Sequence, residues 1–255
     1  MTARVAIVTG GTTGIGLVTA RALIDSGHRL AVGARGASAP ALVTSVREHL
    51  GAQVFVEPLD VADRASCDGF VARVRAALGP PTILVNAAGI YREALLDDHS
   101  EDDWTSQIEI NLSGAFRMTR AVYPGMVDAG WGRIANIAST AGTRGARGHA
   151  GYCASKAGLI GLSKATAVEG APHGISCIAI SPTWVETPMM TDAFHRIART
   201  QAVSLAEARA EIAHSNPQGR IVQAAEVAAL IDFFCSDRAP GLTNVDVQIN
   251  AGADW

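Results

Sequence analysis

The stretch Thr9-Gly10-Gly11-Thr12-Thr13-Gly14-Ile15-Gly16 decides the fold of this chain. It follows the apolar run Val5-Ala6-Ile7-Val8, which is typical of a buried strand, and it opens an amphipathic segment that ends near Gly27. Glycines in such a turn let the backbone approach a pyrophosphate, and the free N–H groups at a helix start face the anion. The place of this turn, on the first strand of an α/β chain, predicts a dinucleotide site. The predicted site comprises Gly10, Thr12, Thr13, Gly14, Ile15 and Gly16.

Beyond this turn, short β-branched runs alternate with longer amphipathic segments. We predict strands at residues 5–9, 29–34, 53–57, 82–85, 133–138, 176–181 and 245–249. Several of these runs are apolar throughout, as in a parallel sheet that is covered on both faces. The alternation predicts a single α/β domain over residues 1–255 with a doubly wound sheet.

The helical segments carry their own start and stop signals. Asp63 is placed to cap a helix that stops at Gly79-Pro80. Between Pro182 and Gly219 the chain adds a long segment with helical character at residues 191–199 and 205–214. A long excursion from a compact sheet is typical of a functional lid. We therefore expect residues 182–219 to form a substrate lid.

Composition excludes several classes of protein. The chain has 255 residues, of which 48% are hydrophobic and 18% charged, and its formal net charge is −3. No basic run is present, so we expect no nucleic-acid partner, and no stretch is apolar enough to span a membrane. The four cysteines are far apart, which predicts free thiols and no metal site. With an apolar strand starting at Val5, we expect no secretory signal and a cytoplasmic protein.

The end of the second predicted strand determines which dinucleotide is preferred. An acidic residue there would bind the adenine ribose 2′-hydroxyl of NAD. The chain instead reads Val32-Gly33-Ala34-Arg35-Gly36, with no acid. Arg35 is a permanent cation that can pair with a 2′-phosphate, so we predict NADP(H). The alternative is that Arg35 is only a solvated loop residue, which would leave NAD(H) as the cofactor.

A tyrosine and a lysine four residues apart, Tyr152 and Lys156, share one face of a helix. A phenol has a pKa of about 10, and a cation held beside it favours the phenolate. Lowering this pKa by three units needs roughly 4 kcal/mol of preference for the anion. Upstream, Ser139 offers a hydroxyl that can hold a carbonyl oxygen while the phenol donates its proton. Taken alone, a tyrosine and a lysine at this spacing are a common helix-surface pair. The surrounding motifs favour a catalytic role for them instead.

Together these motifs resemble the short-chain dehydrogenase/reductase family in its single-domain form, over residues 5–252. The resemblance rests on T-G-x-x-x-G-x-G (9–16), Asp60-Val61, N-A-A-G (86–89), N-L-x-G (111–114), N-I-A-S (136–139), Y-x-x-x-K (152–156) and P-x-x-V-x-T (182–187). It implies a Rossmann fold with helices on both faces of a seven-stranded parallel sheet, in the order 3-2-1-4-5-6-7.

The resemblance also implies a role for each motif residue. Tyr152 is the general acid or base, Lys156 lowers its pKa and binds the nicotinamide ribose, and Ser139 orients the substrate oxygen. Asn111 positions a water in a proton relay to Lys156. The cofactor contacts that it implies, with Arg35 and the glycine turn, are Asp60, Val61, Asn86, Ala87, Ala88, Gly89, Tyr152, Lys156, Pro182, Val185 and Thr187.

Two positions depart from the pattern of the family. Ala87 stands where the second asparagine of N-N-A-G is usual, and Thr183 follows Pro182 where glycine is common. A β-branched residue does not easily take the backbone angles that are open to glycine. Neither change removes a catalytic group, so we expect them to affect only the shape of the nicotinamide pocket.

The substrate is predicted from apolar and aromatic side chains near these motifs. The candidates are Tyr91, Ala141, His149, Trp184 and Met189. Walls of this kind suit a hydrophobic ketone or secondary alcohol. The segments around Ser139 and Trp184 resemble those of reductases of 3-oxoacyl and polyketide intermediates, and we rank an NAD(H)-dependent 3-hydroxyacid dehydrogenase second. A non-catalytic dinucleotide sensor is the alternative of a different class. By resemblance we expect a homotetramer, or a homodimer.

Overall fold

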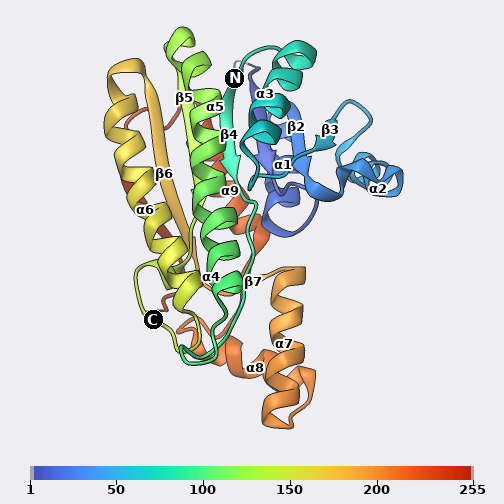
Figure 1. Cartoon of the computed structure of the whole chain (residues 1–255), viewed down its shortest axis with the longest axis vertical. Coiled ribbons are helices and arrows are strands. Elements are labelled where there is room, and N and C mark those ends of the chain that lie inside the picture. Colours follow the sequence, from blue (N-terminus) through green and yellow to red (C-terminus); the bar gives the residue numbers. More distant parts are fainter. Residues whose placement is uncertain (1–2, 254–255) are drawn as a thin grey trace.

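The computed structural model describes residues 3–253 and is built on one seven-stranded parallel sheet (Figure 1). The strand order is β3-β2-β1-β4-β5-β6-β9. The strands are β1 (Val5–Thr9), β2 (Arg29–Ala34), β3 (Phe55–Pro58), β4 (Pro81–Asn86), β5 (Gly132–Ile137), β6 (Ile175–Pro182) and β9 (Val245–Ile249). The predicted order is confirmed. The seventh strand is numbered nine because the short strands β7 (Val185–Glu186) and β8 (Val222–Gln223) pair separately.

Helices cover both faces of the sheet, because alternate residues of the strands face opposite sides. In β1, Ala6 and Val8 belong to one apolar core and Val5 and Ile7 to the other. The first core is closed by α1 (Gly14–Asp25), α2 (Pro40–Leu50) and α9 (Ala224–Cys235). The second is closed by α3 (Arg64–Leu78), α5 (Gly114–Ala129) and the end of α6 (Ala150–Gly170), with α4 (Glu101–Ile108) beside α6.

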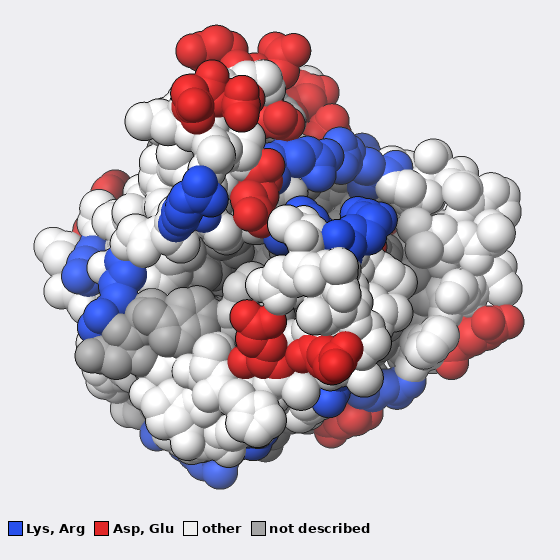
Figure 2. Space-filling view, turned by 90° about the horizontal axis from the view of Figure 1, so that it is seen from below, with Lys and Arg blue, Asp and Glu red and all other residues white. Residues whose placement is uncertain are grey.

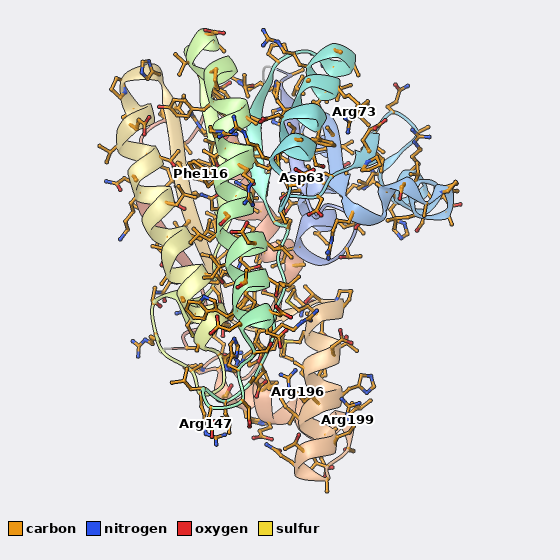
Figure 3. The ribbon with its side chains drawn as sticks, in the orientation of Figure 1. Asp63, Arg73, Phe116, Arg147, Arg196 and Arg199 are labelled. Carbon is orange, nitrogen blue, oxygen red and sulfur yellow. The ribbon has the colours of Figure 1, made fainter. Side chains whose placement is uncertain are left out.

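Helix boundaries follow the signals in the sequence. The Asp63 side chain, labelled in Figure 3, accepts a hydrogen bond from the backbone N–H of Ala65 at the start of α3. The helix stops at Gly79, whose φ of 94° is favourable only for glycine. On α9 the stripe Val227, Ile231 and Phe234 is fully buried. The predicted ends of α3 are confirmed, whereas β3 begins two residues later than expected because residues 52–53 form a turn.

The segment after β6, which was predicted to be a lid, forms a small helical unit of its own. It contains α7 (Pro188–Gln201) and α8 (Leu205–Ser215), as predicted, and both lie beyond the carboxyl ends of the strands (Figure 1). Thr187 caps α7, and α8 starts with a capping box. The lid has a separate apolar cluster made by Met190, Phe194, Ile212 and Ile221. It therefore packs on itself more than on the sheet.

The remaining predictions about whole-chain properties concern cysteines, metals and membranes. All four cysteines are free thiols, and Cys67, Cys177 and Cys235 are buried. Within residues 3–253 there is no cluster of side chains suited to a metal ion. No helix in that range is long and apolar enough to cross a bilayer.

Candidate active site

A cavity of about 620 Å³ opens where the sheet strands end. It runs from the glycine turn after β1, past the ends of β2 and β4, to Tyr152 and the lid. Figure 2 looks at this face from below and shows a hollow with basic side chains around it. Ligands of open α/β sheets bind at the carboxyl ends of strands. Most predicted site residues line this cavity, and Asn86 and Asn111 lie behind its wall.

The glycine turn leaves no room for larger side chains. A Cβ on Gly16 would lie 2.4 Å from the carbonyl oxygen of Gly10. Gly10 itself has a φ of 64°, and a Cβ there would lie 2.8 Å from the Cα of Ala88. Thr13 precedes α1 without a side-chain cap, and the first turn of α1 contains no acidic residue. The unpaired N–H groups at this helix start therefore suit a phosphate group.

Substitution of Gly16 by alanine tests this close packing. We expect Gly16→Ala to lower the free energy of unfolding by roughly 1–3 kcal/mol, because the added methyl group meets backbone that cannot move away. Cofactor affinity should fall as well. Gly125→Ala is the control, since a Cβ on Gly125 meets nothing within 4 Å and alanine favours the helix by about 1 kcal/mol. Thermal melts in which both variants shift equally would contradict this account.

At the far end of the cavity, Arg35 follows β2 in a short 3-10 helix, η1 (Arg35–Ser38). Its side chain is exposed, lines the cavity and has no acidic partner among residues 3–253. Asp60 and Val61 lie nearby on the cavity wall. The Asp60 carboxylate accepts a hydrogen bond from the N–H of Ala62, so it is held by its own loop. This end of the cavity thus offers an unpaired guanidinium.

Tyr152 and Lys156 lie one turn apart near the start of α6, as predicted. The Lys156 ammonium is buried and donates a hydrogen bond to the carbonyl of Ile137 at 2.7 Å. Its Nζ atom lies 5.6 Å from the centre of the Tyr152 ring. The Tyr152 phenol forms a side-chain hydrogen bond with Ser139. The hydroxyl of Ser139 also accepts from the N–H of Ala141, which fixes its position. The three predicted groups are therefore brought together on one wall.

Burial controls the ionisation of this pair. Burial lowers the pKa of Lys156 to about 8, below its usual value of 10.5. Burial also raises the pKa of Tyr152 to about 12, although the hydrogen bond from Ser139 opposes this shift. The role of Lys156 in lowering the pKa of Tyr152 stays a prediction. Tyr152 keeps its proton at neutral pH, which is the form needed to protonate a carbonyl oxygen.

Asn111 lies in a π-helical turn, η2 (Glu109–Ser113), between α4 and α5. Such turns widen a helix and are frequent at functional sites. The Asn111 amide donates to the carbonyl of Ile90 and to the hydroxyl of Ser155, and its oxygen accepts from the N–H of Ile90. A Cβ on Gly89 would lie 3.3 Å from the Asn111 oxygen and 3.7 Å from the Lys156 nitrogen. Asn111 therefore joins the loop after β4 to α6 beside Lys156.

The motif after β4 is held from behind by a buried polar cluster. The Asn86 amide donates to the side-chain oxygen of Asn136 at 2.8 Å and, more weakly, to Thr119. The N–H groups of Ala87 and Ala88 donate to the hydroxyl of Thr9. Asn86 thus supports the cavity wall from within the core. Ala87, at the first departure from the family pattern, lines the cavity directly.

The second departure, Thr183, is accommodated without backbone strain. Thr183 is not among the residues with positive φ, so the position does not require glycine in this chain. Its N–H donates to the carbonyl of Ile249, and the residue lines the cavity. Its hydroxyl is buried and has no hydrogen-bond partner within the part of the chain that the structure describes. A buried unpaired hydroxyl on the cavity wall suits a ligand with polar groups.

All of the substrate candidates line the cavity: Tyr91, Ala141, His149, Trp184 and Met189. The Tyr91 ring packs edge-on against the Tyr152 ring at 5.2 Å. Burial and the nearby Glu93 carboxylate raise the pKa of Tyr91 far above its usual value, so Tyr91 stays protonated. The Tyr91 hydroxyl is occupied by Glu93 and His149, whereas the Tyr152 hydroxyl faces Ser139, so position and not pKa distinguishes the two phenols.

Sequence reasoning missed two charged residues next to Tyr91. Glu93 and Arg196 form an ion pair at 2.6 Å, and both contact the hydroxyl of Tyr91. They lie far apart in the sequence, and neither belongs to a motif, so no local signal identifies them. The apolar residues Ile90 and Ile110 also line the cavity and carry no signal beyond ordinary core patterning.

Comparison with known proteins agrees with this geometry. The model of the short chain dehydrogenase family matches residues 4–198. Acetoacetyl-CoA reductase from Rhizobium meliloti (strain 1021) is 38% identical over 249 residues, which cover 98% of each chain. The 3-oxoacyl-acyl-carrier-protein reductase FabG from Salmonella typhimurium is also 38% identical, over 98% of this chain and 96% of its own. A variant of actinorhodin polyketide ketoreductase solved with NADPH superposes with a TM-score of 0.93 at 36% identity, over 99% of this chain and 98% of its own. The chain belongs to the short-chain dehydrogenase/reductase family of oxidoreductases.

Proposed function

We propose that this protein is an NADP(H)-dependent reductase of hydrophobic ketones, with 3-oxoacyl thioesters as the first substrates to test. The observation that carries the proposal is the placing of Ser139, Tyr152 and Lys156 on one wall of a cavity that also contains the glycine turn and Arg35. The neutral phenol of Tyr152 favours reduction, because that direction begins with a proton donor.

The names of the relatives support the substrate class. Those relatives are named reductases of acetoacetyl-CoA and of 3-oxoacyl groups on acyl carrier protein, and the structural neighbour is a polyketide ketoreductase. The cavity is lined near Tyr152 by apolar and aromatic side chains, including Ile90, Trp184 and Met190. Such walls suit a substrate with an acyl or ring body and one polar oxygen.

Each active-site residue of this chain would have a separate role in reduction of the carbonyl group. A bound nicotinamide cofactor would supply the hydride. The hydroxyl of Ser139, held by the N–H of Ala141, would bind the carbonyl oxygen. Tyr152 would donate its proton to that oxygen as negative charge develops there. The Lys156 ammonium, 5.6 Å from the ring centre, would favour the resulting phenolate.

The preference for NADP(H) is carried by Arg35. A hydrogen bond to a charged group contributes about 1.5–3 kcal/mol, so we expect Arg35→Ala to weaken NADPH binding roughly 10- to 100-fold. NADH binding should change little, because NADH has no 2′-phosphate. Titration of both cofactors by fluorescence or calorimetry measures this. Arg47→Ala, on the exposed side of α2, serves as a control for general charge. Unchanged NADPH affinity in Arg35→Ala would contradict the assignment.

An activity panel tests the function itself. Loss of NADPH absorbance should be fastest with acetoacetyl-CoA or a longer 3-oxoacyl thioester, or with a cyclic ketone. A preference for NADH with a short 3-hydroxyacid would support the alternative dehydrogenase, which is represented among the relatives by D-beta-hydroxybutyrate dehydrogenase from Cupriavidus necator. Tight NADPH binding without turnover of any ketone would support the sensor.

Assembly as a homotetramer remains part of the proposal. Large apolar side chains are exposed on two separate surfaces of the chain. Phe116 on α5, labelled in Figure 3, is 49% exposed, and Val168 on α6 is 64% exposed. Phe233 on α9 is 40% exposed, and Val245 on the edge strand β9 is 37% exposed. Two such surfaces suit two different two-fold contacts, as a tetramer requires. Light scattering after size exclusion measures the mass, and a homodimer would leave one surface free.

A further inference from the structure

A cluster of polar side chains at the mouth of the cavity joins three separate segments of the chain. Tyr91 and Glu93 lie in the loop after β4, His149 immediately precedes α6, and Arg196 lies on the lid helix α7. The Tyr91 hydroxyl is 2.7 Å from the Glu93 carboxylate, 2.7 Å from Nε2 of His149 and 3.3 Å from Arg196. Arg196 also forms an ion pair with Glu93 at 2.6 Å. The Tyr91 hydroxyl is thus the meeting point of the three segments.

Arg196 links the lid helix α7 to the loop after β4 through an ion pair with Glu93. Among residues 3–253, the Arg196–Glu93 pair is the ion pair made by α7. The apolar cluster of the lid joins α7 to α8 and does not reach Glu93. Arg196 also lies over the Tyr91 ring, with its guanidinium carbon 5.3 Å from the ring centre. Both partners are about one-third exposed, so the pair is weak enough to break without unfolding the protein.

The ring of Tyr91 also contacts Tyr152, the proposed proton donor. It meets the Tyr152 ring edge-on, with centres 5.2 Å apart and planes at 88°. Aromatic pairs in this arrangement hold each other in a defined orientation. The hydroxyl of Tyr91 is held by its polar neighbours, which fixes the position of the ring beside Tyr152. The position of the lid and the orientation of the Tyr152 ring are therefore linked by a continuous set of contacts.

We propose that Tyr91 is a positioning residue, which the Glu93–Arg196 pair holds against Tyr152 when the lid is in place. This inference rests on the proposed function, in which Tyr152 donates the proton. Its consequence is that the enzyme is fully active only with the lid docked, because docking completes the anchor of Tyr91. The three residues Tyr91, Glu93 and Arg196 then act as one unit on the catalytic rate, without contributing a proton themselves.

Single substitutions in Tyr91, Glu93 and Arg196 test whether these residues position Tyr152 as one unit. Tyr91→Phe keeps the ring and removes the anchored hydroxyl, and Glu93→Gln and Arg196→Gln each remove one charge of the pair. We expect each to lower kcat roughly tenfold, with NADPH affinity unchanged, and Arg196→Lys to restore most of the rate. The double variant Glu93→Gln/Arg196→Gln should lose no more than either single variant. Arg199→Gln is the matched control, since Arg199 lies on the same helix (Figure 3) and makes no ion pair with any residue in the described range 3–253.

Hydrogen exchange provides a readout that does not depend on turnover. In Glu93→Gln and Arg196→Gln, amide exchange should become faster in α7 and also in the first turn of α6, which carries Tyr152. In Arg199→Gln it should not. Wild-type kcat in Arg196→Gln, or faster exchange confined to α7, would overturn the inference. Failure of the proposed function has a different result, which is a wild-type protein that reduces no ketone. In that case the exchange pattern alone decides whether the lid and the start of α6 are coupled.

Discussion

A Tyr152→Phe protein is expected to bind NADPH as the wild type does and to lose roughly 10²- to 10⁴-fold in kcat. The substitution removes only the hydroxyl that hydrogen-bonds Ser139. The ring keeps its edge-on contact with Tyr91, so the fold and the cavity shape should remain. What is lost is the proton donor, whose high pKa keeps it protonated at neutral pH. Steady-state turnover of a 3-oxoacyl thioester, with cofactor titration alongside, measures both effects.

Tyr123→Phe is a matched control for this experiment. The Tyr123 hydroxyl is buried, has no hydrogen-bond partner among residues 3–253, and lies on α5 outside the cavity. Its removal should leave kcat unchanged and stability equal or slightly higher, because an unpaired buried hydroxyl is a cost to folding. If Tyr152→Phe keeps near-normal turnover, Tyr152 is not the proton donor, whatever the control shows.

Lys156→Met is expected to change activity and stability in opposite directions. Lys156 is a buried ammonium with one hydrogen bond, to the carbonyl of Ile137. Loss of this cation removes the charge that favours the Tyr152 phenolate, so we expect kcat to fall by about 10²-fold or more. The drop in pKa from 10.5 to about 8 represents a burial cost of about 3 kcal/mol. With about 1 kcal/mol lost from the hydrogen bond, we expect Lys156→Met to be more stable by about 2 kcal/mol near neutral pH.

The pH dependence of that gain is fixed by the direction of the pKa shift. Between pH 8 and 10.5 the unfolded chain keeps a proton on Lys156 that the folded protein has released. The stability of the wild type therefore rises with pH across this window, relative to Lys156→Met. The advantage of Lys156→Met should be full below about pH 8 and absent above about pH 10.5. Urea unfolding of both proteins at several pH values measures the difference, and a variant that is less stable at every pH would contradict the account.

The parts of the protein that follow from local rules were predictable from the sequence. The strands themselves rest on short apolar, β-branched runs, and Asp63 and Gly79 mark the ends of α3 by their own side-chain and backbone chemistry. The Tyr152–Lys156 pair follows from helical spacing, and the glycine turn from the need for close backbone contact, as the 2.4 Å approach at Gly16 shows. Each of these features depends on residues close together in the chain.

The remaining features depend on tertiary contacts that no local pattern encodes. Sequence spacing placed Lys156 beside Tyr152, and it did not reveal that burial raises the pKa of Tyr152 in this structure. Thr183 was expected to disturb a glycine position, yet its backbone lies outside the positive φ region. Asn86 was predicted to flank the cofactor, and its side chain instead bonds Asn136 inside the core. The Glu93–Arg196 pair forms only because the lid folds back over the loop after β4.

The central claim is that NADPH bound in the cavity would give its hydride to a ketone, while Tyr152 would supply the proton. A single-turnover experiment tests it most directly: the protein is mixed with an equal amount of NADPH and then with excess acetoacetyl-CoA. We predict oxidation of the bound NADPH in one rapid phase and an equal amount of 3-hydroxy product, with the rapid phase lost in Tyr152→Phe. NADPH that stays bound and reduced with acetoacetyl-CoA, longer 3-oxoacyl thioesters and cyclic ketones alike would contradict the claim.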